Sequence, residues 1–353
     1  MLDSVADALQ NEDYKTAARL LKQLKKEQPK NPWVHLYIGR FYEQTQKLEA
    51  AEKIYRQLLK GTTNPNIISK ARQGLGRLQN IASNKRQEAI TQAITEAGGE
   101  ETGVLVLQPL PKESKQAAAQ KFAEIMEMDA YSARLQLPSR GWRLYRTGKL
   151  GKLQYYVSSL QAAEVPCFCA AISAVEKINV YEVSYFETLE PTPKALCHNQ
   201  DGQLGTLNFE WEEVSQRVEG LLPIFEEVEE MDVRRQYQTK TKILDYTHVY
   251  DLHLPKKNSI VRLCDRNYQF KQGVALADNT TARQNWYNLR HLLEQQLSQT
   301  SLWSDFKIFA ETATDFSQML QHLKPHLNLG RSQQTTWDTA FQLYSCLILL
   351  RSQ

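Results

Sequence analysis

The sequence of 353 residues contains little of what marks several protein classes. It has only five Cys, 15 Gly and 12 Pro. These counts exclude a disulfide-stapled scaffold and a collagen-like fibre. An apolar fraction of 42% excludes a wholly disordered chain, and the length predicts two or three domains at roughly 100 to 200 residues each.

Charge of one sign and long apolar runs are also lacking. Lys and Arg number 43 against 40 Asp and Glu, so a surface built throughout for nucleic acid is excluded. The apolar run Cys346–Leu350 is far shorter than the roughly 20 residues that span a bilayer. The acidic amino terminus does not resemble an export signal, and sparse cysteine fits reduced thiols. We therefore expect a soluble, cytoplasmic protein.

Familiar catalytic and cofactor motifs are missing. The sequence has no GxGxxG, GxxxxGK[ST], HExxH, GxSxG or CxxC pattern, so we expect neither a cofactor nor an enzyme, although a nucleophile and base distant in sequence stay possible. Cys167 and Cys169 share one face of an expected strand. Cys197, His198 and Cys264 could complete a zinc site with them, but a single CxC pair favours buried, metal-free cysteines.

An internal repeat of 34 residues lies near the amino terminus. Ala17, Leu21 and Leu24 recur as Ala51, Tyr55 and Leu58. The small residues Gly39 and Ala51 would let antiparallel helices approach closely. The pattern resembles the tetratricopeptide repeat family over about residues 1–97, with a weaker third unit expected to begin at Leu75-Gly76.

This resemblance implies helical hairpins that bind a partner protein. The implied groove positions lie on the first helix of the second hairpin: Trp33, Leu36, Tyr37, Arg40 and Gln44. Family members that bind chaperone tails use a Lys and Asn set at such positions, which Leu36 and Tyr37 do not supply. Alternatively, these apolar side chains pack against the next helical unit or domain.

A basic stripe accompanies the repeats. Lys15, Arg19, Lys22 and Lys26 follow helical spacing on one face, and residues 1–90 carry 16 Lys and Arg against 9 Asp and Glu. The stripe could attract an acidic partner, RNA or an anionic membrane surface. The alternative is a solvated helix face, and no aromatic side chains interleave for base stacking.

Residues 104–178 predict a small α/β sandwich with a ferredoxin-like arrangement, because short apolar runs alternate with helical patterns. The expected strands and helices are Val104–Leu107, Glu113–Met126, Trp142–Tyr145, Leu153–Ala162 and Val165–Ile172, with Asp129 as a helix cap. The whole chain is thus expected to be an α+β multidomain protein.

Residues 179–353 predict a β-hairpin-rich region followed by a helical tail. The expected strands are Val180–Phe186, Leu204–Phe209, a hairpin of Ile243–Leu254 with Ile260–Cys264, and a third strand at Asn267–Phe270. In Ile243–Leu254 the alternating set that includes Leu244, Tyr246 and Leu252 should face the core. Helices are expected from Thr281, over Phe306–Leu323 and over Trp337–Leu350.

Two charged features complete the sequence. Nine acids and one base lie between Glu210 and Asp232, and Arg234, Arg235, Lys240 and Lys242 then reverse the sign. We interpret this segment as a solvated acidic face or a complement to the basic repeats. The second feature surrounds the hairpin and could bind a small ligand or partner or form exposed ion pairs: Asp245, Asp251, His253, Arg262, Asp265 and Arg266.

The leading functional hypothesis is a non-enzymatic interaction or complex-assembly factor that uses the repeat groove. The remainder of the chain is similar to repeat-containing proteins of cyanobacteria, some relatives of which assist photosynthetic complexes. The alternative is a regulatory module that binds a nucleotide or RNA through basic residues.

Overall fold

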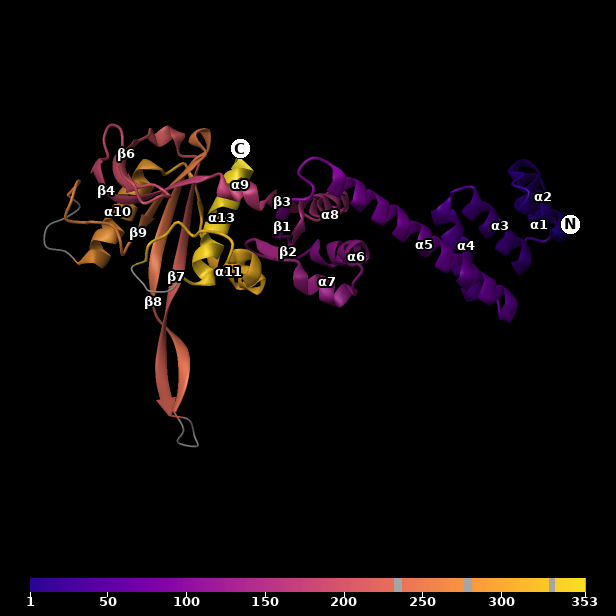
Figure 1. Ribbon diagram of the computed structural model, residues 1–353. Helices are drawn as coiled ribbons and strands as arrows, with labels where there is room; N and C mark the ends of the chain where they lie inside the picture. The colour runs from indigo at the N-terminus through magenta and orange to yellow at the C-terminus, as the bar shows by residue number, and fades with distance from the viewer. Residues whose placement is uncertain (232–236, 276–280, 330–333, 353) are drawn as a thin grey trace. The chain divides into compact units, whose positions relative to one another are not determined.

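The computed structural model describes residues 1–231, 237–275, 281–329 and 334–352, with side chains described outside residues 229–240. The expected α+β organisation is confirmed: amino-terminal repeat helices precede sheets and a carboxy-terminal helix (Figure 1). Contacts divide the chain into two compact units, Met1–Gln92 and Ala93–Gln353. The expected division at residue 178 stays a prediction. In the described ranges, no helix is long and apolar enough to cross a membrane.

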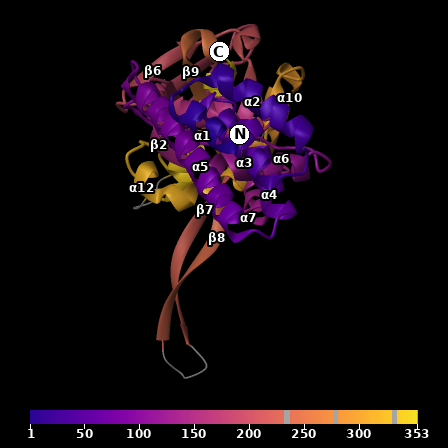
Figure 2. The ribbon, with the colours of Figure 1, turned by 90° about the vertical axis from the view of Figure 1, so that its right-hand side faces the viewer.

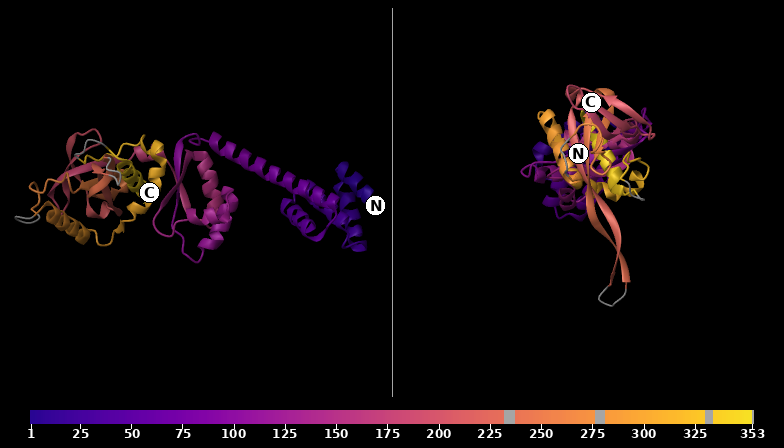
Figure 3. Two further views of the ribbon diagram at one scale, coloured as in Figure 1. Left: turned by 90° about the horizontal axis from the view of Figure 1, so that it is seen from below. Right: turned by 90° about the vertical axis from the view of Figure 1, so that its left-hand side faces the viewer.

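The first unit contains two helical hairpins and most of a long fifth helix. The helices are α1 (Leu2–Gln10), α2 (Tyr14–Glu27), α3 (Pro32–Gln44), α4 (Leu48–Gly61) and α5 (Pro65–Thr95). The side chains of Asp13 and Asn31 accept hydrogen bonds from the first-turn amides of α2 and α3, which fixes where these helices begin. Helix α5 runs for 31 residues without interruption (Figure 3).

Tyr55 of α4 joins the second hairpin to α5. Its ring is fully buried, and a Cβ placed on either Gly39 or Gly74 would lie 2.6 Å from a ring atom. The two glycines therefore let α3 and α5 close on opposite sides of the ring. In the third unit the glycine that packs against this ring is Gly74 and not Gly76, because a Cβ on Gly76 would meet nothing within 4 Å. The expected placement at Leu75-Gly76 was wrong by two residues.

The second unit begins with a three-stranded antiparallel sheet in the order β2-β1-β3. Its elements are β1 (Thr102–Leu107), α6 (Lys115–Met126), α7 (Ala130–Gln136), β2 (Arg143–Lys149), α8 (Leu150–Ala162) and β3 (Cys167–Ala171). Asp129 caps α7 as expected, accepting from the Ser132 amide at 2.8 Å. A ferredoxin-like sheet has four strands, so the described sheet shares its layering but not its full strand set.

A mixed seven-stranded sheet follows, in the order β10-β7-β8-β9-β4-β5-β6. Its strands are β4 (Asn179–Thr188), β5 (Lys194–His198), β6 (Leu204–Asn208), β7 (Gln216–Met231), β8 (Tyr237–Leu254), β9 (Ser259–Cys264) and β10 (Ser301–Trp303). The accompanying helices are α9 (Ile172–Glu176), α10 (Ala282–Gln296), α11 (Phe306–Ala313), α12 (Ser317–Leu320) and α13 (Thr336–Ser352). The expected hairpin of β8 and β9 is confirmed.

Both faces of the central strands are covered. Tyr250 and Leu252 of β8 share one core with Trp286 and Leu289 of α10. Val249 of β8 belongs to another core, which contains α11, α13 and the inner face of the three-stranded sheet. Residues on both sides of position 178 therefore belong to one continuous core.

The structure corrects three predictions about this region. Asn267–Phe270 forms a turn instead of a third strand. The polar face of β8 is also core, because α13 covers Thr247, Asp251 and His253 completely. On the expected core face Leu244 is 66% exposed, since β7 and β8 continue past the neighbouring strands as a two-stranded ribbon (Figure 2). Leu244 is the extra residue of a bulge opposite Ile224 and Phe225.

Candidate functional site

The residues expected to line the repeat groove separate into buried and accessible ones. Leu36 is 2% exposed and packs in the core around Tyr55, so its side chain cannot contact a partner. Trp33 and Tyr37 are half-buried, whereas Arg40 and Gln44 are exposed. The four accessible residues follow helical spacing along α3 and hence share one face.

Cations lie over both aromatic rings of this face. Lys70 Nζ of α5 lies 5.0 Å from the centre of the Trp33 ring, and the Arg40 guanidinium lies 6.0 Å from that of Tyr37. Such contacts are favourable because a cation is attracted to the electron-rich face of an aromatic ring. We call Trp33, Tyr37, Arg40, Gln44 and Lys70 the α3 face.

A hydrogen-bonded network lies beside the α3 face. Glu43 accepts from Tyr55 at 2.7 Å and from the Arg77 Nε at 2.6 Å. Burial raises the pKa of Glu43, but these bonds outweigh it and hold the pKa below its ordinary value. The network fixes α3, α4 and α5 to one another.

The predicted basic stripe lies on α2, and Lys15, Arg19, Lys22 and Lys26 are all exposed. Ala17, Leu21 and Leu24 are buried on the other side of the helix. The amphipathic pattern is therefore confirmed, and the four cations are accessible to an anionic partner.

The predicted cluster around the hairpin divides into a buried and an exposed part. Arg262 binds Asp251 through two hydrogen bonds of 2.8 and 2.7 Å, and both side chains are 0% exposed. Asp245 and Arg266 form an exposed ion pair at 3.2 Å. The cluster is thus not a single surface. Asp265 is half-buried beside His248 and lines one cavity together with Asp245 and Arg266.

The buried part ties α13 to the sheet. Arg262 donates to Gln342 Oε1 at 2.7 Å and to the Pro325 carbonyl at 2.8 Å. Ser345 donates to Asp251 at 2.6 Å and contacts His253 Nε2 at 2.9 Å. Although these residue types resemble a hydrolase triad, Ser345 is 0% exposed and lies between the other two. The arrangement cannot reach a substrate.

The acidic segment is mostly strand. Residues 216–231 form β7, which pairs with β8, and Glu226 lies opposite Lys242. Glu226 and Glu227 are exposed, in agreement with a solvated acidic face. Asp232, Arg234 and Arg235 lie outside the described residues, as do the side chains of Glu229, Glu230 and Lys240.

The cysteines are spread over several elements, and only Cys167 and Cys169 share one among the described residues. Cys167 and Cys169 are on β3, Cys197 is on β5 and Cys264 is on β9. Burial raises the pKa of Cys264 to about 12, so its thiol is protonated at neutral pH. In the part of the chain that the structure describes, no group of three or more His, Cys, Asp or Glu could hold a metal ion.

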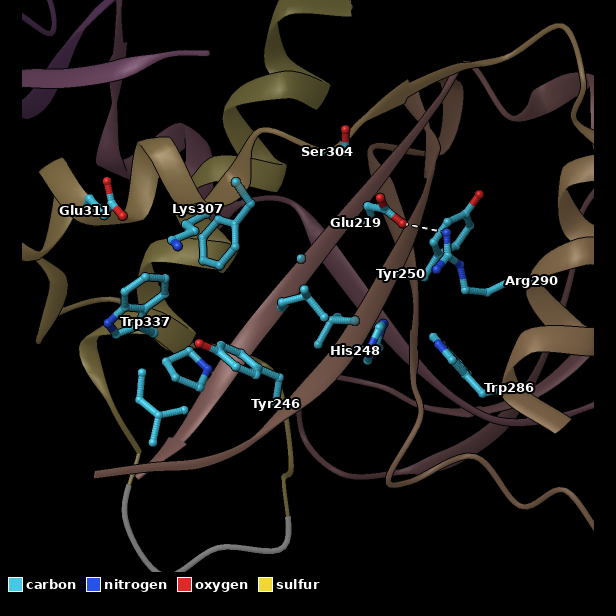
Figure 4. A pocket seen from close by; sticks show the side chains of 16 residues that line it. Glu219, Tyr246, His248, Tyr250, Trp286, Arg290, Ser304, Lys307, Glu311 and Trp337 are labelled. Atoms are coloured by element: carbon cyan, nitrogen blue, oxygen red, sulfur yellow. Dashed lines mark ion pairs between the residues drawn. The ribbon is translucent and has the colours of Figure 1, made fainter. Parts of the chain in front are cut away.

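A cavity of about 530 Å³ lies where the ribbon leaves the sheet (Figure 4). Strand β10 pairs with β7 only from Gln216 to Val218, and the chain then turns away into α11. The cavity lies along the next part of β7, flanked by α10 and α11. We call it the ribbon cavity. Its apolar and aromatic lining consists of Gly220, Leu221, Pro223, Ile243, Tyr246, Val249, Tyr250, Trp286, Phe306 and Trp337.

Polar groups gather on the α10 side of the ribbon cavity. Arg290 Nη2 pairs with Glu219 at 2.7 Å and with Glu294 at 3.4 Å. Figure 4 shows Trp286, Arg290 and His248 side by side in the cavity wall. Trp286 Nε1 and Arg290 Nε are buried and make no hydrogen bond with any described residue. Buried donors of this kind are rare in folded proteins and require an explanation.

A second cavity of about 870 Å³ adjoins the first and shares Leu221, Tyr246, His248, Trp286 and Arg290 with it. Asp265 lines this second cavity. Burial raises the pKa of Asp265 and lowers that of His248, so each group is shifted toward its neutral form.

The ribbon cavity could not be predicted from the sequence. Its walls come from β7, β8, α10, α11 and the start of α13, which are distant in sequence. No sequence signal indicated it, because the alternation of Ile243–Leu254 continues through Tyr246 and the exposure of Leu244 and Tyr246 becomes visible only in the structure.

Comparison with known families supports the repeat assignment for part of the chain. Residues 8–78 match a family described as "Tetratricopeptide repeat". No curated protein and no solved structure matches this chain.

Proposed function

We propose that this protein is a non-enzymatic complex-assembly or scaffold factor that binds a partner protein through the α3 face. The match of residues 8–78 to the tetratricopeptide repeat supports a role in protein–protein interaction. The observation that carries the proposal is the accessible α3 face, with half-buried aromatic rings beside cations. Aromatic and Arg side chains of this kind are typical centres of protein interfaces.

The chemistry of the α3 face favours an acidic partner segment. Arg40 and Lys70 lie on it, and the exposed stripe of α2 adds four more cations to the same unit. An acidic segment would gain from this charge during encounter, and the aromatic rings would supply contact area.

The test is affinity capture from native lysate with the full chain as bait. We expect a defined protein complex that survives high salt. Trp33→Ala combined with Arg40→Glu should remove the complex while leaving the circular dichroism spectrum unchanged. Lys53→Glu is the matched control, since it makes the same charge change at an exposed position of α4.

The alternative function is a regulatory module that binds a nucleotide or RNA through the α2 stripe. The exposure of Lys15, Arg19, Lys22 and Lys26 favours it. Capture would then recover nucleic acid that is lost as salt rises, because each phosphate contact releases counterions.

For the leading proposal, unchanged protein capture by the folded Trp33 and Arg40 variant would remove the α3 face as the binding site.

A further inference from the structure

The ribbon cavity has the size and lining of a small-molecule site. Its volume of about 530 Å³ falls within the range of roughly 300 to 1,000 Å³ typical of such sites. Trp286, Tyr246 and Trp337 supply aromatic walls. A ligand body that fits these walls is apolar and contains rings.

The unpartnered polar atoms of the cavity wall define the head group of the ligand. Trp286 is only 5% exposed, and its Nε1 hydrogen has no acceptor among the described residues. The Arg290 Nε atom is also buried and has no acceptor among the described residues. Both groups only donate hydrogen bonds, so the complementary ligand group is an oxygen acceptor.

The charge of the cavity limits the charge of the ligand. Glu219 and Glu294 already pair with Arg290, so the guanidinium is largely neutralised. Lys307 and Glu311 add one charge of each sign to the lining. Phosphate groups carry up to two charges at pH 7 and would meet the Glu219 carboxylate nearby. A single acid group is therefore better matched than a phosphate.

We propose that the ribbon cavity binds a ring-containing, largely apolar organic monoanion whose acid oxygen accepts hydrogen bonds from Trp286 Nε1 and Arg290 Nε. This site lies in the second unit and is independent of the function proposed for the α3 face.

The test uses 8-anilinonaphthalene-1-sulfonate as the probe, because it combines an aromatic body with one sulfonate. Fluorescence titration of the full chain should give saturable binding near one probe per chain. Trp286→Phe keeps an aromatic ring but removes the donor, and should weaken binding at least tenfold, since hydrogen bonds to charged groups are the stronger class. 2-Naphthoate should displace the probe from the wild type, and its affinity should be weaker for Trp286→Phe in the same way.

The matched control is Trp211→Phe. It removes another buried indole donor, which donates to the Leu189 carbonyl at 3.1 Å. Trp211 does not line the ribbon cavity, so this substitution should leave probe affinity unchanged. Leu221→Trp provides a second variant at a position that is 46% exposed and therefore tolerant, and it should abolish binding by filling the cavity. Absence of saturable binding, or equal affinity in the wild type and Leu221→Trp, would overturn the proposal.

Discussion

Single residues at close contacts decide how the repeat unit packs. A Cβ at Gly74 would lie 2.6 Å from the fully buried Tyr55 ring, whereas one at Gly76 meets nothing within 4 Å. The two positions lie on the same helix. Alanine substitutions at the two positions therefore separate the effect of crowding against Tyr55 from the effect of helix propensity.

We predict that Gly74→Ala lowers the free energy of unfolding by about 1 to 3 kcal/mol, the usual result of overpacking a core. Gly76→Ala should leave it unchanged or raise it by about 0.5 to 1 kcal/mol, because alanine favours the helix. Urea unfolding followed by circular dichroism measures both. Equal effects of the two substitutions would contradict the contact with Tyr55.

His253 gives the second unit a pH-dependent stability. Burial lowers its pKa to about 4 from 6.5, so the unfolded chain binds a proton more readily than the folded one between these values. The contribution of the neutral His253 side chain to the free energy of unfolding is fully present above pH 6.5 and is lost as the pH falls towards 4. The loss amounts to about 3 kcal/mol at pH 4.

Replacing the imidazole isolates this contribution. His253→Gln cannot ionise, so its free energy of unfolding should fall less than that of the wild type between pH 7 and pH 4.5. The comparison uses urea unfolding at several pH values, and titrating groups that do not interact with His253 cancel in the difference. Parallel pH profiles would rule out His253 as the source.

Buried polar contacts tie the helix α13 to the sheet. Asp251 and Arg262 on adjacent strands hold it through Ser345 and Gln342. These groups are fully buried, and removing one partner of such a pair leaves an uncompensated charge in the core.

We predict that Asp251→Asn lowers the free energy of unfolding by about 3 to 5 kcal/mol. Asp245→Asn breaks the exposed pair with Arg266 and should change it by less than about 1 kcal/mol. Chemical denaturation of both variants at neutral pH provides the measurement. A small effect of Asp251→Asn would mean that Arg262 finds sufficient partners in the Pro325 carbonyl and Gln342.

The whole molecule has two compact units with separate cores. We expect two calorimetric transitions. Gly74→Ala should shift one of them and Asp251→Asn the other, because the substitutions lie in different units. A single transition displaced by both variants would show that the units unfold together.

The sequence predicted those features that depend on local patterns. The repeat period located both hairpins, and alternation located the β8–β9 pair. Strand β7 was missed because its acids and Pro223 hide the alternation. The burial of Asp251 and His253 could not be predicted, since the covering helix α13 follows more than 80 residues later. The ribbon cavity depends on the same kind of distant packing.

The ribbon formed by β7 and β8 also bears on how copies of the chain meet one another. Unpaired strand edges and the exposed side chains of Ile243 and Leu244 are templates for pairing between molecules. Glu226 and Glu227 lie exposed next to them, and repulsion between like charges opposes such pairing. Neutralising these two carboxylates is therefore expected to promote self-association well before it affects folding.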